Sequence, residues 1–213
     1  MKALLKTIAL TATLIASSQA SAYTDLLADM AVYKTPEDVK AVKVDDLETD
    51  LEKFQYSYSK VRLSFDENGK NKLGEKLMPQ TIIELKELHS NGFTPASLSL
   101  GLIEIGNIKR QCEKEEYQAK CLSVISPKVE GYLIPVANED ESGKAASLLS
   151  SYYLQTYTEK GREKNYEWSR IGKEKMTAYR EEWRETGERP KPTFMLTDEE
   201  KKAKEEGKSF FSW

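Results

Sequence analysis

The sequence predicts an all-α protein with a helical bundle-like core, one disulfide and a helical C-terminal extension. A short extended segment is expected near residues 129–136. Two observations predict the helices. Apolar residues recur at three- and four-residue steps, which places them on one side of a helix. Residues that favour a helix start, such as Thr35 with Pro36 and Thr94 with Pro95, precede several of these segments.

A short helix and then a long one are expected between residues 35 and 65. The long segment carries one apolar stripe, formed by Leu47, Leu51, Phe54, Tyr58, Val61 and Phe65. A strand is the alternative, because apolar residues also alternate at 54–58 and at 61–65. The two runs have opposite parity, so a strand would have to change face between them. The helix accounts for the whole stripe.

Two further helices are expected between Pro79 and the first cysteine. Pro79 opens the first of them, and Gly92 ends it because glycine readily adopts the left-handed conformation. Thr94 and Pro95 start the next one. From Leu98 to Ile105 this helix is apolar nearly all round, which predicts a central buried position.

The second half of the chain is expected to complete the core and then to extend from it. Residues 144–157 bring Leu149, Tyr153 and Tyr157 to the core. After Gly161 a narrower stripe lies on an otherwise charged helix and consists of Trp168, Ile171, Met176, Tyr179 and Trp183. Thr197 begins a capping box that leads into a last, strongly charged helix.

The first 22 residues have the pattern of a secretory signal peptide. Lys2 and Lys6 precede a short apolar stretch, and Ala20, Ser21 and Ala22 form the cleavage motif. The stretch is too short to span a bilayer as a helix. We expect a periplasmic or secreted protein of a Gram-negative bacterium, with no integral membrane segment after the signal peptide is removed.

Cleavage leaves a helical core domain, residues 23–158, and a charged helical extension with an aromatic tail, residues 159–213. Residues 23–142 contain 15 basic and 22 acidic side chains, and residues 143–213 contain 15 and 13. Neither part has the clustered positive charge that nucleic-acid binding requires. We therefore expect no nucleic-acid partner.

Cys112 and Cys121 are the two cysteines of the chain, and an even number in an exported protein predicts a disulfide. On one continuous helix they would lie roughly 13 Å apart, which is too far for a bond. The chain must therefore turn between them. A zinc site and a reactive thiol are weaker alternatives, since His89 is the only histidine of the chain.

Residues 64–75, SFDENGKNKLGE, resemble the calcium-binding loop of an EF-hand. Four residues stand at matching loop positions: Asp66, Asn68, Gly69 and Glu75. Ser64 stands where the first aspartate is expected, and asparagine followed by glycine is a common turn in its own right. We favour a polar turn and expect no metal and no cofactor. A calcium-responsive helical module built on Asp66, Asn68 and Glu75 is an alternative.

The sequence contains no recognisable catalytic constellation. His89 falls in the last turn of a predicted helix, where the helix dipole stabilises its charge, and we assign it a structural role. Neither G-x-S-x-G nor H-E-x-x-H occurs. The enzyme alternative is a small periplasmic hydrolase that cleaves cell-wall polymer with a pair of carboxylates, whose placement across a cleft the sequence does not define.

The leading functional hypothesis is a non-enzymatic envelope protein that acts through protein–protein interaction, as an inhibitor, an immunity-type protein or an assembly accessory. Tryptophan and tyrosine are favoured at binding hot spots. The residues predicted to contact the partner are Trp168, Tyr179, Trp183, Phe210, Phe211 and Trp213. The alternative is that the stripe on the charged helix is simply the last part of the core.

Overall fold

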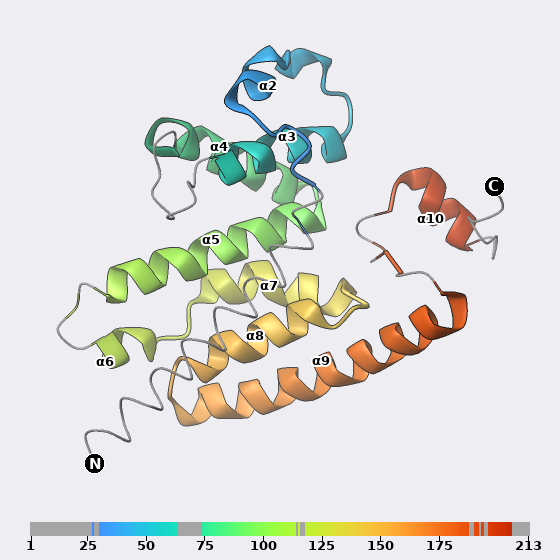
Figure 1. The fold of residues 1–213 in the computed structure, drawn as a ribbon. Helices are drawn as coiled ribbons and strands as arrows, with labels where there is room; N and C mark the ends of the chain where they lie inside the picture. Colours follow the sequence, from blue (N-terminus) through green and yellow to red (C-terminus); the bar gives the residue numbers. More distant parts are fainter. Residues whose placement is uncertain are drawn as a thin grey trace. The chain divides into compact units, whose positions relative to one another are not determined.

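The computed structural model describes residues 27, 30–63, 74–113, 115, 118–187, 190–191, 193 and 196–205 (Figure 1). These residues form helices and no strands, so the predicted all-α class is confirmed. The chain separates into two compact units, Met1–Ile108 and Lys109–Trp213, each of which is described by itself.

The first unit contains α2 (Pro36–Ala41), a 3-10 helix (Val44–Asp46), α3 (Asp50–Leu63), α4 (Gly74–Ser90) and most of α5 (Thr94–Cys112). Helix α2 starts with a capping box in which Thr35 and Asp38 satisfy each other's backbone N–H groups. Helix α3 packs on both α2 and α4.

The core of the first unit forms around Phe54, which is fully buried on α3. Its ring stacks on Tyr58, with 5.5 Å between the centroids, and contacts the ring of Phe93 at the same distance. The predicted α3 stripe is confirmed at Phe54, Tyr58 and Val61, which are buried. Leu47 precedes the helix, and Phe65 lies outside the described residues.

The predicted start of α4 at Pro79 is wrong, because the helix begins at Gly74 and Pro79 lies inside it. A proline inside a helix removes one backbone hydrogen bond. Pro79 itself is exposed. The start of α5 at Thr94 and its end at Cys112 are as predicted.

The second unit contains α6 (Gln118–Leu122), α7 (Pro127–Glu139), α8 (Lys144–Leu154), α9 (Glu159–Thr186) and α10 (Asp198–Glu205). Helix α8 packs on α7 and on the long helix α9 (Figure 1). The core of this unit consists mainly of Val129, Leu133, Val136, Ala145, Ala146, Leu149, Tyr153, Trp168 and Tyr179. The division of the chain between residues 158 and 159 stays a prediction.

The extended segment expected near residues 129–136 is wrong, because these residues lie within α7. Ser126 caps the helix by accepting a hydrogen bond from the Val129 N–H, and proline follows it at the first helical position. Val129, Leu133 and Val136 are fully buried at helical spacing. Gly131 and Pro135 concealed this pattern in the sequence, but both are exposed and leave the buried face intact.

The predicted disulfide between Cys112 and Cys121 is confirmed. Helix α5 ends at Cys112 and α6 begins at Gln118, so the chain turns between the two cysteines. Their Cα atoms are 5.4 Å apart. Within the described part of the chain, no helix combines the length and the apolar character needed to cross a membrane. The predicted signal peptide, residues 1–22, lies outside the described residues.

Candidate interaction surface

Helix α9 carries the aromatic stripe that the sequence singled out, and the structure divides that stripe in two. Trp168 and Tyr179 are 7 % and 8 % exposed and pack within the second unit. Trp183 is 45 % exposed at the C-terminal end of the same helix. Of the predicted partner contacts on α9, Trp183 alone is exposed.

Close packing against α8 fixes the position of α9. A Cβ atom on Gly172 would lie 2.9 Å from the Ser147 hydroxyl oxygen and 3.2 Å from the Gly143 carbonyl oxygen. Gly143 itself has a φ of +73° at the N-cap of α8, a conformation that favours glycine. The two helices therefore meet at positions where a larger side chain does not fit.

Lys175 on α9 forms hydrogen bonds with the end of α7. Its ammonium group donates to the carbonyl oxygens of Ala137, Asn138 and Asp140, at 2.8, 2.7 and 3.0 Å. These carbonyls lie at the C-terminus of α7, where a positive charge is favoured. The Asp140 carboxylate accepts the Ala145 N–H at 2.7 Å and so caps the start of α8. The loop between α7 and α8 is thus held from both sides.

A second polar cluster joins α7, α8 and α9. The Glu130 carboxylate accepts a hydrogen bond from the Tyr153 hydroxyl at 2.7 Å and forms an ion pair with Lys164. Burial raises the pKa of Glu130, but the hydrogen bonds from Lys164 and Tyr153 outweigh it and the net pKa is lowered. Burial and the bond to Glu130 raise the pKa of Tyr153. Glu130 is therefore ionised at neutral pH, and its bonds to Tyr153 and Lys164 join the three helices.

The segment after α9 folds back onto the second unit. Gly187, with a φ of +74°, ends α9 in the left-handed conformation. The Tyr179 hydroxyl donates to the Pro190 carbonyl oxygen at 2.6 Å, and the Thr193 hydroxyl donates to Glu141 in the α7–α8 loop at 2.9 Å. The capping box predicted at Thr197 is present, because Thr197 and Glu200 exchange hydrogen bonds.

The turn between α8 and α9 exposes two apolar side chains. Leu154 and Tyr157 are 54 % and 68 % exposed. Tyr157 has a φ of +55°, which is unusual for an aromatic residue. The prediction that Tyr157 belongs to the core is therefore wrong, because the helical period ends at Leu154, whereas the predicted positions Leu149 and Tyr153 are fully buried.

The first unit contains a buried charge pair that the sequence did not reveal. The Lys60 ammonium lies 2.5 Å from the Glu84 carboxylate, and the Ser57 hydroxyl donates to the same oxygen at 2.6 Å. The Lys60 ammonium also lies 4.3 Å from the centre of the Tyr56 ring. Each polar group of this cluster is paired, which is the arrangement of a structural contact between α3 and α4.

The sole histidine also makes a structural contact. His89 lies in the last turn of α4, as predicted, and its Nδ1 atom is 2.7 Å from the Ser97 hydroxyl on α5. Among the described residues, no group of three or more histidine, cysteine, aspartate or glutamate side chains is placed to hold a metal ion. The alternative prediction of a calcium-binding loop falls outside the described residues. Asp66 and Asn68 are not described, and neither is the side chain of Glu75.

The chain matches no protein-family model, no curated protein and no solved structure. Its function has therefore to be argued from its own residues. Phe210, Phe211 and Trp213, the remaining predicted contacts, lie outside the described part of the chain.

Proposed function

We propose that the chain is an exported, non-enzymatic protein that acts by binding another protein of the cell envelope, and that the C-terminal end of α9 contacts this partner. The observation that carries the proposal is the 45 % exposure of Trp183. A large indole on a well-packed helix is a typical binding hot spot once a partner covers it. The tail residues Phe210, Phe211 and Trp213 are proposed as a second contact.

Four of the described carboxyl groups have a lowered pKa. In Asp38, Glu52 and Glu200 hydrogen bonds lower the pKa, and in Glu130 the bonds from Lys164 and Tyr153 overcome the effect of burial. A glycosidase requires instead a carboxyl group with a raised pKa as its general acid. The downward shifts are those of carboxylates that serve as helix caps and ion-pair partners.

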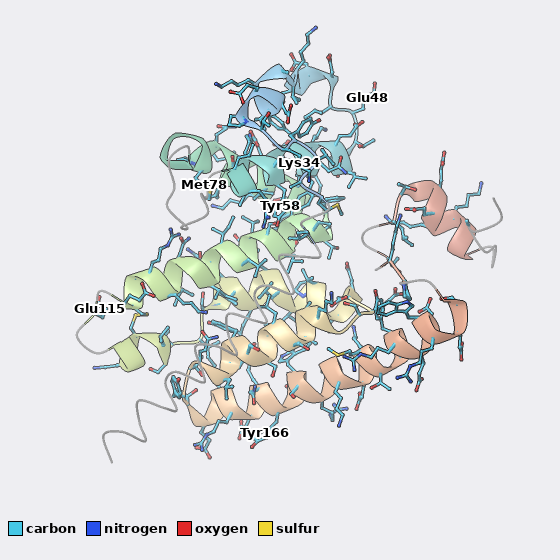
Figure 2. All side chains as sticks on the ribbon, viewed as in Figure 1. Lys34, Glu48, Tyr58, Met78, Glu115 and Tyr166 are labelled. Atoms are coloured by element: carbon cyan, nitrogen blue, oxygen red, sulfur yellow. A yellow bond between two sulfur atoms is a disulfide. The ribbon has the colours of Figure 1, made fainter. Side chains whose placement is uncertain are left out.

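The test is affinity capture from the native envelope fraction with the full chain, with Trp183→Ala and with Tyr166→Ala as the matched control. Tyr166 is 74 % exposed on the outer side of α9 (Figure 2). Loss of a hot-spot side chain weakens binding by at least about tenfold. We expect a stoichiometric companion with the wild type and with Tyr166→Ala, but not with Trp183→Ala. Equal recovery with all three chains would contradict the proposal.

Point substitution is preferable to truncation here. A chain that ends at Thr158 lacks Trp168, which is 7 % exposed, and Gly172, which packs closely on α8. Such a truncation disrupts the second unit and removes binding for a trivial reason. Trp183→Ala leaves both of these contacts in place.

A further inference from the structure

Helix α9 carries a basic stripe and an acidic stripe side by side on the face that points away from α8. The basic stripe consists of Arg162, Lys173, Arg180 and Arg184. The acidic stripe consists of the residue that follows each of them, Glu163, Glu174, Glu181 and Glu185. All of these side chains are exposed, and steps of eleven, seven and four residues keep each stripe along one line of the helix. Trp168, Gly172 and Tyr179, which are buried, lie on the opposite side.

The charges of the two stripes are little used within the protein. In α9, which is described throughout its length, one ion pair involves a member of either stripe, and it joins Arg170 to Glu174 at 2.9 Å. Its two side chains are 65 % and 62 % exposed, and an exposed pair of this kind is weak. The stripes are therefore available to another molecule.

The arrangement of the two stripes is complementary to itself in one orientation. A two-fold axis that runs between two copies of α9 and parallel to them places the basic stripe of each copy opposite the acidic stripe of the other. Because the stripes are one residue apart, the facing residues differ in height by only about 1.5 Å. A two-fold axis across the helices would make them antiparallel and would bring like charges together, which is unfavourable.

We infer that the outer face of α9 binds a second copy of this chain, with the two α9 helices parallel and related by a two-fold axis. Arg162 of one copy faces Glu163 of the other, and the two-fold axis makes each such pair occur twice. Because exposed ion pairs are individually weak, the Kd of the dimer is on the order of tens of micromolar. Trp183 lies outside both stripes, so the inference goes beyond the proposed function and does not depend on it.

The test compares the full chain with two charge-reversed double variants by sedimentation velocity. Arg162→Glu with Arg180→Glu makes both stripes acidic at these positions, and Glu163→Lys with Glu181→Lys makes both basic. The wild-type chain should dimerise at about 100 µM in about 50 mM NaCl, and its Kd should rise at least about tenfold in about 500 mM NaCl, because salt screens exposed charges. Each variant alone should be monomeric, and an equal mixture of the two should dimerise again.

The control is Glu182→Lys, which reverses an exposed charge outside both stripes and should leave the Kd unchanged. Carbodiimide cross-linking of the mixed dimer determines the orientation, since it joins a lysine to a carboxylate in direct contact. Parallel helices place position 163 of one variant against position 162 of the other, whereas antiparallel helices place it against the far end of the other helix.

Four results would overturn the inference. They are a wild-type chain that stays monomeric in low salt, a dimer that persists in both double variants, a mixture that stays monomeric, and a cross-link from position 163 to the far end of α9. The proposed function is tested separately, because capture of the companion depends on Trp183 and not on either stripe.

Discussion

Each unit contains a lysine–glutamate ion pair with an aromatic ring beside the lysine, and the two pairs differ in how deeply the lysine is buried. In the first unit Lys60 forms an ion pair with Glu84 and lies over the ring of Tyr56. A serine hydroxyl donates a hydrogen bond to the same Glu84 carboxylate. In the second unit Lys164 pairs with Glu130 and lies 5.0 Å from the centre of the Tyr153 ring. Each ion pair joins two helices that also contribute apolar side chains to the core of their unit.

The difference lies in how much water reaches the lysine. The side chain of Lys60 is 5 % exposed and that of Lys164 is 27 % exposed, while the two glutamates are similar at 25 % and 24 %. A buried charge that loses its partner is strongly destabilising, whereas a partly hydrated one is not. The same interaction should therefore matter more in the first unit, and the following substitutions test this comparison.

Glu84→Gln should have the largest effect, because it takes the carboxylate away from the ammonium group of Lys60, whose side chain is 5 % exposed. We expect a loss of about 3 kcal/mol in the free energy of unfolding, measured by urea denaturation and far-UV circular dichroism. The double variant Lys60→Met with Glu84→Gln should recover more than half of this loss, since no charge is then buried. A single variant within about 1 kcal/mol of the wild type would show that Lys60 is hydrated.

Gly172→Ala should destabilise the second unit by about 2 kcal/mol, because the added methyl group lies against Ser147 and the Gly143 carbonyl oxygen. Gly131→Ala is the matched control. A Cβ at position 131 in α7 has no atom within 4 Å, so this change should stabilise the protein by about 0.5–1 kcal/mol. Two substitutions of the same sign would contradict the close contact of α8 with α9.

Glu130→Gln should cost about 1 kcal/mol at neutral pH, less than Glu84→Gln, because the lysine that is left behind, Lys164, is 27 % exposed. Tryptophan fluorescence follows the second unit, since all three tryptophans lie between residues 109 and 213. If Glu130→Gln destabilised its unit more than Glu84→Gln destabilises the first, the exposure of the lysine would not govern the two pairs.

Acid should weaken the second unit through Glu130. The pKa of this carboxyl is lowered from its ordinary value of 4.5, so its stabilisation is complete above that pH and is lost as the pH falls through the folded value. The loss should amount to less than about 1 kcal/mol because the group is partly hydrated. Glu130→Gln should flatten the acid limb of the curve of unfolding free energy against pH, and an unchanged limb would refute this assignment.

The features that could be predicted from the sequence are those that depend on residues close together in the chain. The stripe of α3 and the caps of α2 and α10 are local patterns, and the structure contains them at Phe54, Thr35 and Thr197. The disulfide followed from the even number of cysteines, and the distance between them on a continuous helix then required a turn.

The contacts that lie far apart in the sequence could not be predicted. Lys60 and Glu84 are 24 residues apart, and Lys175 reaches carbonyl groups 35 to 38 residues away. A lysine in a sequence reads as solvated, and only the packing of two helices shows that its charge is buried. The folding back of Pro190 onto Tyr179 likewise depends on the direction in which α9 ends.

Acrylamide quenching of two single-tryptophan chains tests the central claim most directly, namely that α9 is anchored at Trp168 and displays Trp183. One chain retains Trp168 and the other Trp183, with the remaining tryptophans replaced by phenylalanine. With exposures of 7 % and 45 %, the quenching constant should be several-fold larger for Trp183. Equal constants would contradict the claim, because both rings would then be either buried or exposed.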